Sequence, residues 1–203
     1  MTAATAGTRR RRQLTREDIL PVAEYAQQRR ERRRAISELK KRRRVEVGPF
    51  ATFYFENYDT MWQQVHEMLY IEKGGDAQIA EELGAYNPMI PQGGELVATV
   101  MLEIEDPKRR ATVLARLGGI EDHLFIEVAG QRINGKPDPS RENTSPEGKA
   151  SSVQFVWFPF TAAQIARFRA PDARIVVGCD HPNYAHMAVM PDPVRAALAE
   201  DFD

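Results

Sequence analysis

The stretch that best defines the fold is LVATVMLEI, residues 96–104, in which apolar side chains recur at every second position. A period of two places the even-numbered residues from Leu96 onward on one face of a β-strand. Residues 124–128 repeat this pattern, and residues 153–160 are apolar on both faces, which is typical of a central strand. Strands with a single apolar face favour a mostly antiparallel sheet.

Further strands are predicted at 45–47, 52–55 and 174–180. Apolar residues at helical spacing and capping residues predict helices up to about Arg43, from Thr60 to about Lys73, from Asp76 to before Pro88, from Pro107 to Gly118, and from Thr161 and Asp192 onward. We therefore expect an α+β fold: a mostly antiparallel sheet of about five to six strands with helices packed on one face, plus a basic N-terminal helical arm.

The 203 residues, 42% of them hydrophobic, are enough for one ordinary core. We expect a disordered basic tail at 1–13, a basic helical arm at 14–44, and a single α+β domain at 45–203 with an exposed loop at 131–150. The sequence contains no stretch that predicts a membrane span and no complete export signal, and Cys179 is its one cysteine. These features predict a cytoplasmic protein.

Charge is distributed unevenly along the chain. Residues 1–44 hold 15 Lys and Arg against 5 Asp and Glu, a net charge of +10, and residues 45–203 hold 13 against 24, a net charge of −11. The charge pattern by itself favours packing of this basic helix on the protein's own acidic body. The same basic excess could bind an acidic protein partner, through Arg29, Arg30, Arg32, Arg33, Arg34, Lys40, Lys41, Arg42, Arg43 and Arg44. Nonspecific binding to nucleic acid is a further alternative.

Side chains that bind metals or transfer protons cluster in CDHPNYAH, residues 179–186. His181 and His186 supply two imidazoles at a spacing that is compatible with convergence on a metal ion. Asp180 and Tyr184 are candidates for positioning a bound water or a substrate.

The helix predicted over 60–73 carries a carboxylate where an apolar residue is expected. At 100° per residue, Glu72 falls near the middle of the apolar stripe, where a carboxylate is costly unless it is protonated, paired or bound to a cation. His66 lies at the edge of that stripe, and Glu67, on the opposite side, would support such a site. If the fold brings Glu72 or His66 to the histidines of residues 179–186, the ligands would suit iron, zinc or manganese.

Each of these residues also has a structural interpretation. Asp180 can cap the turn that follows it, and His186 can be an exposed loop residue. Glu72 can reach water at the end of its helix or pair with Lys73, and Cys179 is typical of a small buried hydrophobe. The sequence leaves these alternatives open.

Five motifs together resemble one family: KRRRVEVGP at 41–49, FEN at 55–57, EML at 67–69, AYNPMIP at 85–91 and DHP-x-Y at 180–184. They are similar to the bacterial family called domain of unknown function 3501, over nearly everything from Leu14 onward. That family has no established activity, so the resemblance transfers no catalytic residue. Its members look to be encoded often beside rubrerythrin and an iron-sulfur oxidoreductase, which implies a role in redox chemistry or peroxide defence.

Our leading expectation is a cytoplasmic accessory protein of an iron-linked redox system that docks a redox partner through its charged surfaces. One alternative is a metal-dependent enzyme that uses the histidines and Glu72. The other is nonspecific nucleic-acid binding through the basic arm.

Overall fold

The stretch 96–104 contributes the central strand of the larger of two sheets. In the computed structural model, which describes residues 11–203, it forms β3 (Glu95–Leu102), with an antiparallel neighbour on each side. This first sheet has the order β1-β2-β3-β7-β6, with β1 at Arg44–Val47, β2 at Ala51–Phe55, β7 at Val153–Pro159 and β6 at Lys136–Pro137.

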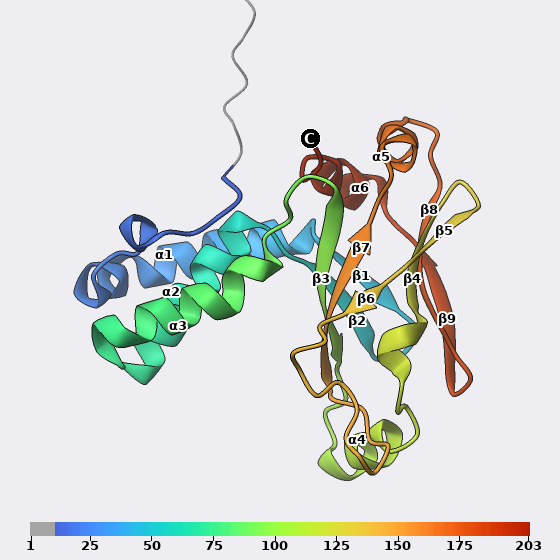
Figure 1. Cartoon of the computed structure of the whole chain (residues 1–203), viewed down its shortest axis with the longest axis horizontal. Coiled ribbons are helices and arrows are strands. Elements are labelled where there is room, and N and C mark those ends of the chain that lie inside the picture. Colours follow the sequence, from blue (N-terminus) through green and yellow to red (C-terminus); the bar gives the residue numbers. More distant parts are fainter. Residues whose placement is uncertain (1–10) are drawn as a thin grey trace, which may run out of the picture.

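The second sheet packs against the first, face to face (Figure 1). Its order is β5-β4-β8-β9, again with antiparallel pairing throughout, and its bounds are Gln131–Asn134 (β5), Leu124–Val128 (β4), Ile175–His181 (β8) and Tyr184–Val189 (β9). The main core lies between the sheets, where Phe53, Val100 and Phe158 of the first sheet are buried with Ile126 and Val177 of the second. The period-two alternation of each strand produces this core, because one face of every strand points inward.

Short helices close the two ends of this sandwich (Figure 1). One end is covered by α4 (Pro107–Leu114), and the other by α5 (Ala162–Arg169) and α6 (Asp192–Ala199). At the α5–α6 end, the rings of Phe160, Phe168 and Phe202 pack together with centroids 4.8 to 5.7 Å apart.

Three helices form an arm that projects from the outer face of the first sheet (Figure 1). They are α1 (Val22–Lys41), α2 (Tyr58–Glu72) and α3 (Gly75–Tyr86). Short 3-10 helices lie at Arg16–Asp18 (η1), Asn87–Met89 (η2) and Ile120–His123 (η3). A second hydrophobic cluster joins the arm to the sheet, because Met61 and Val65 of α2 are buried with Met89 and with Val97 of β3.

The predicted α+β class and the antiparallel pairing are confirmed. Instead of one sheet with helices on one face, the strands divide between two sheets, and helices lie on one face and at both ends. The strand at 124–128 buries its apolar face against the first sheet rather than extending it. Among residues 11–203, no helix combines the length and apolar content needed to cross a bilayer.

Local differences from the prediction have simple causes. The helix expected to start at Thr60 starts at Tyr58, because Asn57 is the N-cap and its side chain accepts a hydrogen bond from the Thr60 backbone N–H at 3.0 Å. The segment 131–150, expected to be a loop, begins with β5 and β6 before its turns.

The tail expected at 1–13 lies mostly outside the described residues, which begin at Arg11. In the part that is described, Arg12 donates to the carbonyls of Pro91 at 2.8 Å and Asp201 at 2.7 Å. These two bonds tie the chain to the body before the helical arm begins.

Candidate functional site

His181 lies at the end of β8 and bonds only to backbone. Its Nε2 donates to the Gly118 carbonyl at 3.2 Å, and its Nδ1 accepts the Asn183 backbone N–H at 3.2 Å. This pattern requires the neutral Nε2–H tautomer. With 6% of its surface exposed, His181 holds the β8–β9 turn to the segment after α4 and offers no free nitrogen to a metal.

The side chain of Tyr184 connects the two sheets through hydrogen bonds. Its hydroxyl donates to the Val47 carbonyl at 2.6 Å and accepts the backbone N–H groups of Phe50 at 3.2 Å and Ala51 at 2.9 Å. Burial raises the pKa of this phenol. Tyr184 thus fastens the β1–β2 turn to β9, with the exposed ring of His186 packed on it at 4.6 Å between centroids.

Asp180 lies on the face of the second sheet opposite to His181 and Tyr184. It pairs with two residues that the sequence analysis did not single out. Arg132 Nη1 lies 2.7 Å from one carboxylate oxygen and His123 Nδ1 lies 3.0 Å from the other. The hydrogen bond from Arg132, followed by that from His123, lowers the pKa of Asp180 to about 2. The arrangement is an exposed ion-pair network rather than a buried acid–base pair.

His66 and Glu67 lie on α2 and hold the arm together. The Nδ1–H of His66 donates to the Trp62 carbonyl at 2.7 Å, and its Nε2 accepts the Leu20 backbone N–H at 3.0 Å. Glu67 accepts two hydrogen bonds from Arg29, at 2.9 and 2.8 Å, and one from the Tyr25 hydroxyl at 2.6 Å. Burial alone would raise the pKa of Glu67, but these hydrogen bonds outweigh it and the pKa is lowered.

The expected meeting of the helix at 60–73 with the cluster at 179–186 does not occur. Glu72 is the last residue of α2, so its carboxylate is exposed and bonds to Gln78 Nε2 at 2.7 Å. The arm lies on the outer face of the first sheet, whereas His181 and His186 belong to the second sheet (Figure 1). Over residues 11–203, no three His, Cys, Asp or Glu side chains are grouped so that they could hold a metal ion.

The basic residues of the arm divide into bound and exposed sets. Arg29 pairs with Glu67, and the guanidinium of Arg32 lies 4.9 Å from the centroid of the Trp62 ring. Arg43, which we expected on the binding surface, is 4% exposed and pairs with Asp201. Arg32 is nonetheless exposed, as are Arg30, Arg33, Arg34, Lys41, Arg42 and Arg44, and Lys40 is half-buried.

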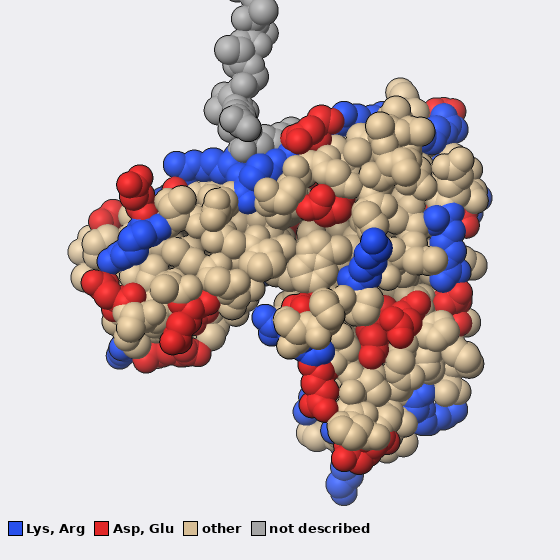
Figure 2. Space-filling model, in the orientation of Figure 1, with Lys and Arg blue, Asp and Glu red and all other residues tan. Residues whose placement is uncertain are grey.

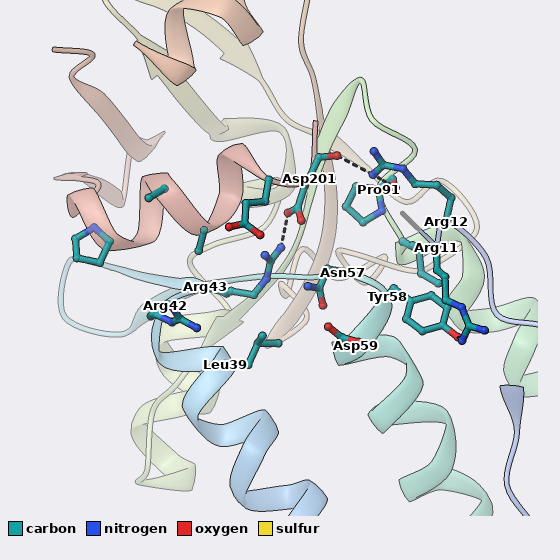
Figure 3. A pocket seen from close by; sticks show the side chains of 15 residues that line it. Arg11, Arg12, Leu39, Arg42, Arg43, Asn57, Tyr58, Asp59, Pro91 and Asp201 are labelled. Atoms are coloured by element: carbon teal, nitrogen blue, oxygen red, sulfur yellow. Dashed lines mark hydrogen bonds and ion pairs between the residues drawn. The ribbon is translucent and has the colours of Figure 1, made fainter. Parts of the chain in front are cut away.

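A cleft of about 680 Å³ lies where the arm meets the body, between the end of α1, the start of α2 and α6 (Figure 3). Arg43 reaches across it to Asp201, and Arg11 donates to the Tyr58 hydroxyl at 2.8 Å on the opposite wall. Asp59 and Glu200 also line the cleft. Because its walls carry both signs of charge, the cleft specifies neither an anion nor a cation.

Glu56 is a further candidate for binding a ligand, and it was not among the residues that the sequence singled out. Glu56 follows β2, is 5% exposed, and has one carboxylate oxygen with no hydrogen-bond partner among the described residues. The sequence contained a signal for it, since Phe53 and Phe55 face the core and the alternation therefore puts Glu56 on the other face of the strand. That face is buried only because the arm covers it, which the strand pattern alone does not reveal.

One family model and one solved structure are similar to this chain over most of its length. A family model described as "Protein of unknown function (DUF3501)" matches residues 13–202. A crystal structure of a novel protein of unknown function from Burkholderia pseudomallei is similar at 38% identity and a TM-score of 0.87, over 94% of this chain and 99% of that chain. No curated protein matches. The chain therefore belongs to the DUF3501 family of proteins of unknown function.

Proposed function

We propose that this protein is a cytoplasmic accessory protein that docks an acidic protein partner through the basic face of α1, which we define as Arg30, Arg33, Arg34 and Lys41. One observation carries the proposal. Arg30, Arg33 and Arg34 are exposed and form no hydrogen bond or ion pair with any residue in the described part of the chain. Three neighbouring guanidinium groups are thus available to carboxylates of another protein.

The helical period gathers these charges on one side of α1. At 100° per residue, Arg30, Arg34 and Lys41 fall within about 40° of one another, and Arg33 lies about 60° from Arg30, toward Arg29. The acidic residues Glu38 and Glu31 flank this face, about 40° and 60° from Arg34, and Lys41 pairs with Glu38 at 2.7 Å. Figure 2 shows basic side chains along the upper edge of the arm.

The opposite side of α1 fixes the basic face in place. Tyr25, 1% exposed, packs against the rings of Trp62 and His66, and Arg29 makes a two-pronged hydrogen bond to Glu67. A surface held in this way loses little conformational freedom when a partner binds, which favours affinity. Complementary charge also increases the rate of association.

The resemblance of the motifs suggests which partners to test first. Because members of this family look to be encoded beside rubrerythrin and an iron-sulfur oxidoreductase, we propose a docking partner from an iron-linked redox or peroxide-defence system. The contribution of this protein would then be binding rather than chemistry, in keeping with a basic face that is preformed.

The test measures the affinity of the purified full-length chain for a purified rubrerythrin and for the iron-sulfur oxidoreductase, at low and at high salt. We expect binding that weakens steeply with salt, because the contacts are between exposed charges. Changing Arg30, Arg33 and Arg34 together to Gln should weaken binding by about tenfold or more at low salt.

A matched control removes the same charge elsewhere: Lys108, Arg109 and Arg116, exposed residues of α4 and the turn after it, are changed to Gln. This variant should bind as the unchanged protein does. The proposal fails if both triple variants bind alike. Equal or tighter binding to a duplex DNA of random sequence, again lost with Arg30, Arg33 and Arg34, would favour nucleic acid instead.

A further inference from the structure

A small cavity lies in the angle between the helical arm and the outer face of the first sheet, where Figure 2 shows the surface hollowed. Its volume is about 320 Å³, at the lower end of the range for small-molecule sites. The sheet provides Tyr54, Thr99, Met101 and Phe155, and the helices provide Met61 and Met89. These walls are mainly apolar, and their flexible methionine side chains can adapt to ligands of different shape.

Glu56 is the polar centre of this cavity. Its Oε1 accepts a hydrogen bond from the Thr99 hydroxyl at 2.7 Å, which fixes the carboxylate. Its Oε2 has no hydrogen-bond partner among residues 11–203, although the side chain is 95% buried. A buried carboxylate oxygen without a donor is costly, so its presence beside a cavity indicates a ligand that brings a donor.

The neighbouring side chains do not supply that donor. The Tyr54 hydroxyl donates to Glu103 Oε1 at 3.0 Å, and Gln64 Nε2 donates to the Tyr86 hydroxyl at 3.4 Å. Lys40 lines the same cavity but forms no ion pair with Glu56 or with any other described carboxylate.

We propose that this cavity binds a small organic amine as its ammonium ion, with an N–H donated to Glu56 Oε2 and the apolar part of the molecule against Met61, Met89 and Phe155. A charged donor is favoured over a neutral one, because hydrogen bonds between two ions are shorter and stronger, most of all where water is excluded. This site is on a different surface from the basic face of α1, so the two proposals stand or fall separately.

The test uses the full-length protein with ¹³C-labelled methionine methyl groups, observed by NMR. Benzylamine and n-hexylamine are the probes, and benzyl alcohol and 1-hexanol are their neutral counterparts. We expect each amine to shift the methyl signals of Met61, Met89 and Met101. The methyl of Met187, on β9 and 69% exposed, should not move and serves as an internal control. The alcohols should bind about tenfold more weakly or worse.

Two variants test whether binding requires the Glu56 carboxylate and the empty volume of the cavity. Glu56→Gln keeps an oxygen for the Thr99 hydroxyl but removes the charge, and should weaken amine binding by about tenfold or more. Met101→Trp fills the cavity and should abolish binding with Glu56 intact. Glu103→Gln is the matched control: its carboxylate, on the same face of the sheet, is already bonded to Thr52 and Tyr54, so amine binding should be unchanged.

Several outcomes would overturn the proposal. The first is that the amines, at millimolar concentration, do not shift the Met61 and Met89 signals. The second is that the alcohols bind as tightly as the amines, and the third is that Glu56→Gln binds the amines as the unchanged protein does. Amine binding that is seen only after Lys40→Met would also overturn it, because Lys40 would then be the natural partner of Glu56. If Glu56→Gln does not fold, Met101→Trp and the alcohols still decide the question.

Discussion

Arg43 and Asp201 form a buried ion pair that ties the arm to the body of the protein. Their side chains are 4% and 9% exposed. The guanidinium of Arg43 also donates to the carbonyls of Phe55 at 3.0 Å and Glu56 at 3.1 Å. One side chain thus joins the end of α1, the end of β2 and the segment after α6, so the orientation of the arm depends on it.

Replacing Arg43 should therefore destabilise the whole protein. Arg43→Met leaves the Asp201 carboxylate and two carbonyls buried without this donor, and we expect a loss of about 3–5 kcal/mol in the free energy of unfolding. Urea denaturation followed by circular dichroism measures it. Arg44 is the control, because it is exposed and its Nη2 lies 3.8 Å from Glu46 Oε1. Arg44→Met should lower the free energy of unfolding by less than about 0.5 kcal/mol. Equal stability of the two variants would contradict this account.

A second prediction concerns the hydroxyl that fastens the two sheets together. Tyr184→Phe removes the donor to Val47 and the acceptor for the N–H groups of Phe50 and Ala51, while the ring stays in place. We expect a loss of about 1–3 kcal/mol, because the backbone groups remain partly buried without a partner. Tyr54→Phe, which removes a hydroxyl bonded to the exposed Glu103, is the control and should cost less. Thermal and urea unfolding of both variants would decide the point.

The fold was largely predictable because its signals are local. Period-two alternation marked the strands at 96–104 and 124–128, and capping residues marked the helices. The division into two sheets was not predictable, since an apolar face does not say whether it will meet a helix or another sheet. The N-cap of α2 was misplaced, at Thr60 instead of Asn57, because both are good N-caps and only their mutual bonds show which is used.

The candidate site was less predictable, because it depends on which elements meet. His181 and Glu72 were joined by an assumption about packing, and the structure separates them. Arg43 and Arg30 look alike in a run of basic residues, yet Arg43 is buried and Arg30 is exposed. Glu56 was missed because the alternation of the strand places it on the face away from the core, and the pattern does not reveal that the arm covers that face.

The stability of the arm should depend on pH through His66. Burial, and to a lesser extent the charge of Arg32, holds the pKa of this imidazole below its ordinary value of 6.5. Below pH 6.5 the unfolded chain binds a proton that the folded protein excludes. Stability is therefore complete above that pH and falls as the pH is lowered, by at most about 1.4 kcal/mol per pH unit.

Urea denaturation of the unchanged protein and of His66→Gln, between about pH 5 and 7, measures this contribution. The variant is less stable at neutral pH but should show a flatter dependence, because it has no proton to bind at this position. The window ends near pH 5, where most Asp and Glu side chains are still ionised. The same slope in both proteins would rule out His66 as the source.

Arg132 should control the protonation of Asp180. Its Nη1 bonds to the carboxylate at 2.7 Å, its Nε bonds to Asn134 at 2.7 Å, and its guanidinium lies 4.0 Å from the centroid of the Phe125 ring. Because three contacts hold this one cation, its bond to Asp180 is well fixed, and the pKa of about 2 follows from it. Arg132→Gln should raise the pKa of Asp180 toward its ordinary value of 3.8.

A ¹³C NMR titration of the Asp180 carboxyl group measures this shift. Arg132→Lys should restore only part of it, because an ammonium group cannot make the three contacts at once. Arg141→Gln, which removes the arginine paired with Asp138 at 3.3 Å, is the control and should leave Asp180 unchanged. If the pKa of Asp180 stays near 2 in Arg132→Gln, then His123, 3.0 Å from the other oxygen, must be the main cause, and His123→Gln should produce the shift instead.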